Sequence, residues 1–145
     1  MILNEKGILR QSDLVVYPIK LVVVIGDMEE EVNKYYMPRD KHYNWIGAPK
    51  EGVGAAVSLV EKKKDGKYGL MVWFSTFNDC IGSNLCHECG HLSLEIFRYI
   101  GAKINYEDQE PFCYLLGTIF RLCNDAFYYW KDFIGKKQEK DEKNK

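Results

Sequence analysis

Two histidines and a glutamate form a compact pattern in the second half of the chain. Segment 86–91 reads CHECGH and contains His-Glu-x-x-His. On a helix, residues four apart lie about 40° apart around the axis, so His87 and His91 can hold one metal ion. Glu88 lies about 100° from His87 and about 60° from His91, close enough to hydrogen-bond a water in the open position of the ion. The pattern predicts a zinc site in which Glu88 activates a zinc-bound water.

A catalytic zinc site needs three protein ligands and an open fourth position. The extended pattern with a Gly and a third His is absent, because Leu94 and Phe97 stand where those residues would be required. This excludes a metzincin. Eighteen residues separate His91 from Glu110. Here the sequence resembles the gluzincin metallopeptidases, whose signature is His-Glu-x-x-His followed by eighteen residues and Glu.

The resemblance extends from His87 to about Cys123. It implies that His87, His91 and Glu110 are zinc ligands and that Glu88 is the general base. Segment 110–117, EPFCYLLG, is also similar to small zinc peptidases predicted in phages and prophages. The resemblance therefore implies a zincin-like metallopeptidase, a hydrolase that uses Zn²⁺ to cleave a peptide or protein substrate.

Other carboxylates compete for the role of third ligand. Glu107 and Asp108 are close to Glu110 in sequence, and Glu95, one turn beyond His91, is either a ligand or a partner that orients an imidazole. We favour Glu110 for two reasons. Its spacing from His91 matches the pattern given above, and a carboxylate at the start of a buried helix is unusual unless it has a functional role. Four side chains are candidate hydrogen-bond donors to the oxyanion of a tetrahedral intermediate: His42, Tyr106, Tyr114 and Arg121.

Two readings without catalysis compete with the peptidase. In one, zinc only fastens two helices together and contributes folding energy. In the other, the chain is a regulatory or phage-assembly protein whose cleft holds a peptide of a partner. Cys86 and Cys89 also form C-x-x-C, but both lie toward Leu92 and Ile96 on the helical wheel. We interpret them as small core residues rather than ligands or a redox pair.

The first half of the chain predicts a sheet. Segment 14–25, LVVYPIKLVVVI, is typical of a strand, and Asp27 can cap a short helix over 28–36. Segments 55–62 and 68–77 predict a hairpin, because an Asp-Gly pair at 65–66 lies between two extended runs. Segment 37–54 has the composition of a loop beside a cleft.

The second half predicts two helices. Apolar residues from Leu85 to Ile100 recur on one helical face, Ser83 or Asn84 can cap the start, and Gly101 ends this motif helix. A second helix is predicted from about 108 to 134, closed by Gly135. Residues 136–145 predict a charged flexible tail, which leaves 1–135 as a single zincin-like domain.

These elements predict an α+β fold in which a small twisted antiparallel or mixed sheet packs against the motif helix and the long C-terminal helix. Strand 68–77 directly precedes the motif helix, so we expect it to edge the cleft and to pair with an extended substrate.

Composition excludes several classes of protein. Twenty basic and twenty-one acidic residues give a net charge of -1, with no basic stripe that would bind nucleic acid. The longest aliphatic run, 19–25, is interrupted by Lys20 and is far too short to span a bilayer, so no membrane association is expected. Five cysteines are an odd count, and we expect reduced thiols in the cytoplasm. The sequence indicates nothing about oligomeric state.

Overall fold

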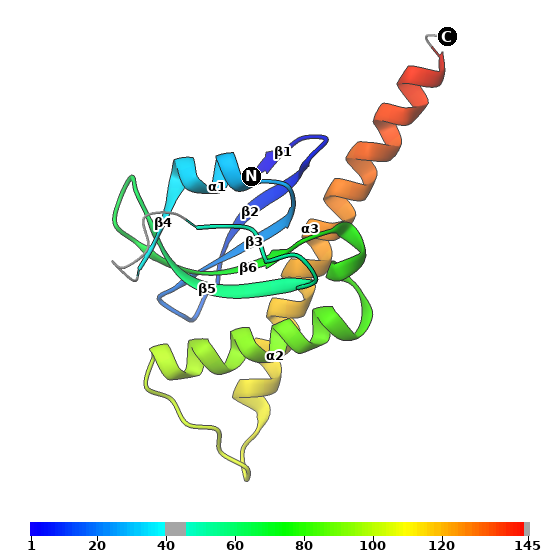
Figure 1. The fold of residues 1–145 in the computed structure, drawn as a ribbon. Helices are drawn as coiled ribbons and strands as arrows, with labels where there is room; N and C mark the ends of the chain where they lie inside the picture. Colours follow the sequence, from blue (N-terminus) through cyan, green and yellow to red (C-terminus); the bar gives the residue numbers. More distant parts are fainter. Residues whose placement is uncertain (40–45, 144–145) are drawn as a thin grey trace.

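The computed structural model describes residues 1–39 and 46–143 as one six-stranded sheet covered on both faces by helices (Figure 1). The elements in chain order are β1 (Ile2–Leu3), β2 (Gly7–Asp13), β3 (Lys20–Gly26), α1 (Glu29–Tyr35), β4 (Tyr36–Pro38), β5 (Ala55–Lys62), β6 (Tyr68–Phe74), the 3-10 helix η1 (Phe77–Cys80), α2 (Gly82–Tyr99) and α3 (Glu110–Lys143). None of the described helices is both long enough and apolar enough to cross a membrane.

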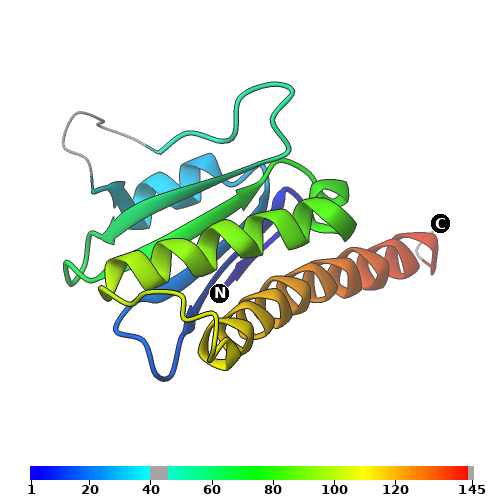
Figure 2. The same ribbon diagram turned by 90° about the horizontal axis from the view of Figure 1, so that it is seen from below.

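The strand order is β1-β2-β3-β6-β5-β4. β3 and β6 run parallel, and every other neighbouring pair is antiparallel. α2 and α3 lie side by side on one face of the sheet (Figure 2), and α1 lies on the other. This confirms the predicted α+β fold with a mixed sheet packed against the motif helix and a long C-terminal helix.

The two central strands explain why both faces of the sheet are covered. In β3, Leu21, Val23 and Ile25 belong to the core beneath α2 and α3, whereas Val22 and Val24 belong to the core beneath α1. β6 alternates in the same way. A strand that is buried on both faces needs a continuous apolar run, and that is the pattern of both segments.

The hairpin prediction is confirmed. β5 and β6 pair antiparallel, and Gly66 in their turn has a φ of +66°, a conformation that favours glycine. The predicted strand over 14–25 is wrong in its first half, because 14–19 form a turn and the strand begins at Lys20. Pro18, which has no N–H to give to a sheet, lies in that turn. The sequence analysis also missed β1, β2 and β4, of which β1 and β4 are only two and three residues long.

The predicted helix starts are displaced. Met28 rather than Asp27 occupies the N-cap of α1, and Ile81 rather than Ser83 or Asn84 occupies the N-cap of α2; neither cap makes a side-chain hydrogen bond. The predicted end of α2 at Gly101 is confirmed. Gly101 has a φ of +70°, and the Ala102 N–H donates to the Phe97 carbonyl at 2.9 Å, the long hydrogen bond that closes a helix end.

The predicted end of α3 at Gly135 is wrong, since the helix continues to Lys143; the predicted flexibility of 136–145 stays a prediction. One helical glycine costs only about 1 kcal/mol, and the Lys, Glu and Gln residues that follow are good helix formers. Two contacts also tie this end of the helix to the N-terminus: the indole N–H of Trp130 donates to the Asn4 carbonyl at 3.0 Å, and Lys137 forms an ion pair with Glu5.

Candidate metal centre

The motif helix α2 has one buried face and one exposed stripe. The buried face carries Leu85, Cys89, Leu92, Ser93, Ile96 and Phe97. His87 and His91 are both exposed. They lie opposite that face because they are about 200° and 240° around the axis from Leu85. Packing therefore fixes the helix from one side and leaves both imidazoles open to solvent.

The structure brings the two predicted histidine ligands together. The Nε2 atoms of His87 and His91 are 3.0 Å apart, and their rings meet edge to face at 80°. Two nitrogens bound to one tetrahedral zinc ion, each at about 2.05 Å, lie about 3.3 Å apart. The pair therefore fits a zinc ion after a shift of a few tenths of an ångström. Without metal, the same distance suits a hydrogen bond between two neutral imidazoles.

Glu88 lies beside the histidine pair, on the flank of α2 that faces β5. It is seven residues, or two turns, before Glu95, so both carboxylates are on the same side of the helix. Glu95 and Leu59 of β5 line one cavity, which identifies that side as the β5 side. Glu88 is only partly exposed, whereas the two histidines are exposed. Glu88 is therefore next to His87 in the chain but on the neighbouring flank of the helix.

The structure does not add Glu110 to the histidine pair. Glu110 is the first residue of α3 and is exposed, on the side of that helix opposite its buried residues. The neighbouring Phe112 contacts Phe97, with ring centroids 5.5 Å apart. Phe97 is six residues, or about 9 Å, along α2 from His91. Among the described residues, no three His, Cys, Asp or Glu side chains form a cluster that could hold a metal ion.

The strand that was predicted to edge the cleft lies inside the sheet. β6 lies between β3 and β5, so its main-chain groups are already paired on both sides, and it cannot bind an extended peptide. On this side of the sheet the outermost strand is the three-residue β4, and β5 lies next to it. Its last residues pair with β4, and the Arg39 N–H donates to the Leu59 carbonyl at 3.2 Å. Because alternate residues point the same way, Ala55 and Val57 also direct their main-chain groups outward.

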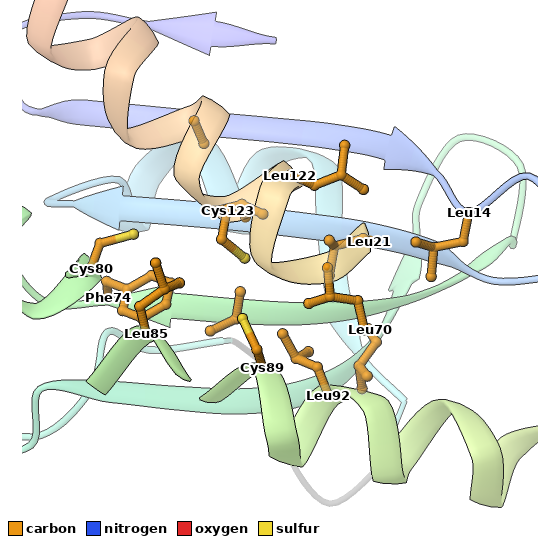
Figure 3. Close-up of a cluster of buried hydrophobic side chains, with 14 of the residues drawn as sticks. Leu14, Leu21, Leu70, Phe74, Cys80, Leu85, Cys89, Leu92, Leu122 and Cys123 are labelled. Carbon is orange, nitrogen blue, oxygen red and sulfur yellow. The ribbon is translucent and has the colours of Figure 1, made fainter. Parts of the chain in front are cut away.

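The cysteines divide into buried and exposed groups. Cys80, Cys89 and Cys123 are buried in the core beneath α2 and α3 (Figure 3). Burial raises the pKa of Cys80 to about 12, and a hydrogen bond to Cys89 together with burial raises the pKa of Cys123. The interpretation of Cys89 as a core residue is confirmed. The same interpretation of Cys86 is wrong, because Cys86 is exposed at the margin of the buried face.

Three of the four predicted oxyanion donors fall within the described residues, and they lie in different places. Tyr114 and Arg121 line a cavity of 440 Å³ between α3 and the β2–β3 turn. Tyr106, in the connection from α2 to α3, is 83% exposed. His42 lies outside the described residues. Arg39 and Arg98, which line a cavity beside α2, were not identified from the sequence, because no motif contains them.

Comparisons with known proteins give no match to a family model, a curated protein or a solved structure.

Proposed function

We propose that the chain is a zinc-dependent metallopeptidase. The observation that carries this proposal is the exposed histidine pair, whose Nε2 atoms are 3.0 Å apart on a helix that also presents Glu88 beside them. A packed helix that directs two imidazoles outward at the separation of two zinc ligands has little structural use for them. Histidines that only packed would contribute to the core, and these two do not.

We propose His87, His91 and Glu110 as the zinc ligands. Glu110 completes the set only if the first turn of α3 moves toward His91. The contact that opposes this motion is the edge-to-face pair of Phe112 and Phe97, and such a pair is worth about 0.5–1.5 kcal/mol. Zinc binding in small folded sites releases about 10–16 kcal/mol. Of the residues in that turn only Phe112 is partly buried, so the contact that would be lost is small beside the free energy that a complete zinc site supplies.

Glu88 is the proposed general base. Zinc, when bound, lowers the pKa of a coordinated water to about 7 and polarises the carbonyl of the substrate. The Glu88 carboxylate accepts the proton of that water and later donates it to the leaving amine. Glu88 directly follows His87 and lies on the β5 side of α2, which supports this role.

The proposed substrate is a peptide or an unfolded segment of a protein, bound in extended form. No strand of the described residues pairs with the outward main-chain groups of Ala55 and Val57, which could offer hydrogen bonds to such a segment in the way that a new strand adds to a sheet edge. All five cysteines are free, which suits a reducing compartment, and we propose that the protein acts in the cytoplasm.

Metal analysis and one substitution test this proposal. We expect purified protein to contain one zinc per chain and to lose thermal stability when a chelator removes it. Glu88→Gln should lower peptide hydrolysis by about 10²–10⁴-fold, the usual contribution of a general base, while zinc content and unfolding stay unchanged. A protein that holds zinc but cleaves no peptide in either form would instead be a zinc-binding module, and a protein without zinc would contradict both.

A further inference from the structure

The cavity that Arg39 and Arg98 line lies between the C-terminal half of α2 and the sheet. It has a volume of about 290 Å³, at the small end of ligand pockets. Its lining combines two guanidinium groups from different elements, one carboxylate and an apolar floor: Arg39, Arg98, Glu95, Ile19, Leu59, Leu70 and Tyr99. We call it the guanidinium cavity.

We propose that the guanidinium cavity binds a carboxylate of the peptide substrate, an inference that rests on the proposed function. Arg39 and Arg98 together carry two positive charges, and Glu95 carries one negative charge, so the cavity is positive by one charge. Guanidinium groups bind carboxylates in a planar, two-point geometry. The apolar floor suits the methylene stem of an acidic side chain.

The position of the cavity links it to the histidine pair. Arg98 is seven residues from His91, which places it about 20° away around the helix and about 10 Å further along it. Both side chains therefore lie on one exposed stripe of α2. About 10 Å corresponds to three residues of an extended peptide. A substrate whose scissile bond is held at the histidine pair would reach the cavity about three residues away.

The edge of β5 leads toward the cavity. A Cβ added at Gly54 would lie 3.1 Å from the Asn84 side chain, so the start of β5 is beside the start of α2. Leu59, four residues into the strand, lines the cavity. At Leu59 the Arg39 N–H occupies the strand edge. A peptide paired with Ala55 and Val57 could therefore not continue its main-chain pairing past Leu59, which is where the cavity begins.

The existing contacts of the two arginines leave room for a ligand. Arg39 lies over the ring of Tyr68, at 4.5 Å from its centroid, and this stacking leaves the edge of the guanidinium available. Arg98 forms a 3.0 Å ion pair with Glu95, but its side chain is 80% exposed. An incoming carboxylate would compete with Glu95 for Arg98, which makes Glu95 a built-in competitor.

The carboxylate has two chemical sources, and they correspond to two substrate directions. β5 runs alongside α2, from the start of that helix, which is nearer to the histidine pair, toward the cavity. A peptide that pairs antiparallel, the more stable arrangement, would place an acidic side chain there, about three residues before the scissile bond. A peptide that pairs parallel would place its C-terminal carboxylate there instead.

Three labelled peptides distinguish these sources in zinc-free Glu88→Gln protein, with fluorescence anisotropy as the readout. One carries an acidic side chain and an amidated C-terminus, one has a neutral sequence and a free C-terminal carboxylate, and one is neutral and amidated. We expect one of the first two to bind about tenfold more tightly than the third. Arg98→Ala should remove this difference, Arg98→Lys should restore part of it, and Glu95→Gln should increase it.

Arg121→Ala is the matched control. Arg121 is also an exposed arginine with a carboxylate partner on its own helix, Asp125 at 3.6 Å, but it lies on α3 away from the cavity. This variant should keep the preference. The inference would be overturned if all three peptides bound equally or if none bound. It would also be overturned if Arg121→Ala lost the carboxylate preference as much as Arg98→Ala does. A wild-type protein that holds zinc and cleaves peptides, combined with no carboxylate preference in the binding assay, would overturn only this inference. A carboxylate preference in the binding assay, combined with wild-type protein that neither binds zinc nor cleaves peptides, would overturn only the proposed function.

Discussion

The two sides of α2 differ in what they contribute to the protein. The side that faces the sheet carries Leu92 and Ile96, both fully buried, and the thiol of Cys89. The outer side carries His87 and His91, whose side chains contribute nothing to the core. The residues that stabilise the fold and the proposed metal ligands are thus about half a turn apart around one helix. The difference teaches that substitutions on the two sides should have separable effects, and the predictions below test that separation.

The largest expected effect is on the buried side. Leu92→Ala removes a fully buried side chain and should lower the free energy of unfolding by about 2–5 kcal/mol. Leu94→Ala, on the same helix but 47% exposed, should change it by less than about 0.5 kcal/mol. Urea unfolding followed by circular dichroism measures both. Similar losses in the two variants would show that the helix is not packed as the structure describes.

The next effect is on the outer side. His91→Ala removes a proposed ligand and should weaken zinc binding by more than about 100-fold, since even an outer partner of a metal ligand is worth 10–100-fold. Without metal, the free energy of unfolding of His91→Ala should be within about 0.5 kcal/mol of the wild-type value, because the side chain that is lost is exposed. Chelator competition gives the affinity, with Leu94→Ala as the control. Unchanged zinc affinity in His91→Ala would place the metal elsewhere.

A smaller effect should identify the third ligand. Glu110→Gln should weaken zinc binding by about tenfold to 100-fold, because a neutral amide replaces a charged ligand. Glu95→Gln should leave zinc affinity nearly unchanged, since Glu95 already pairs with Arg98 at 3.0 Å. Glu107→Gln and Asp108→Asn test the two other carboxylates that compete with Glu110 for the role of third ligand. If one of these three weakens zinc binding more than Glu110→Gln does, that residue replaces Glu110 in the site.

The smallest effect concerns pH. Burial raises the pKa of Cys80 from 9.0 to about 12. Below about pH 9 this thiol is protonated in both the folded and the unfolded protein, so it does not change the free energy of unfolding. Between pH 9 and 12 the unfolded chain loses the proton while the folded protein keeps it, so the free energy of unfolding falls. Urea midpoints across this range should decline, and Cys80→Ala should decline less steeply. An equal decline in both proteins would assign the effect to other groups, such as Tyr36, whose pKa burial also raises to about 12.

The sequence alone determined the local features. A period of 3.6 residues located α2, the glycine after it marked its end, and the Asp-Gly pair marked the β5–β6 hairpin. The spacing of His87 and His91 on one helix was enough to bring their side chains together. These features depend on contacts within a few residues, where the geometry of the backbone leaves few alternatives.

Only the tertiary structure decided which elements are neighbours. It placed β6 in the interior of the sheet and β5 toward the edge, gave the sheet a second covered face beneath α1, and carried α3 past Gly135. It also left Glu110 apart from the histidines and put Arg39 near Arg98. Contacts between distant segments depend on which apolar faces pack together, and the spacing of residues along one segment does not specify that choice.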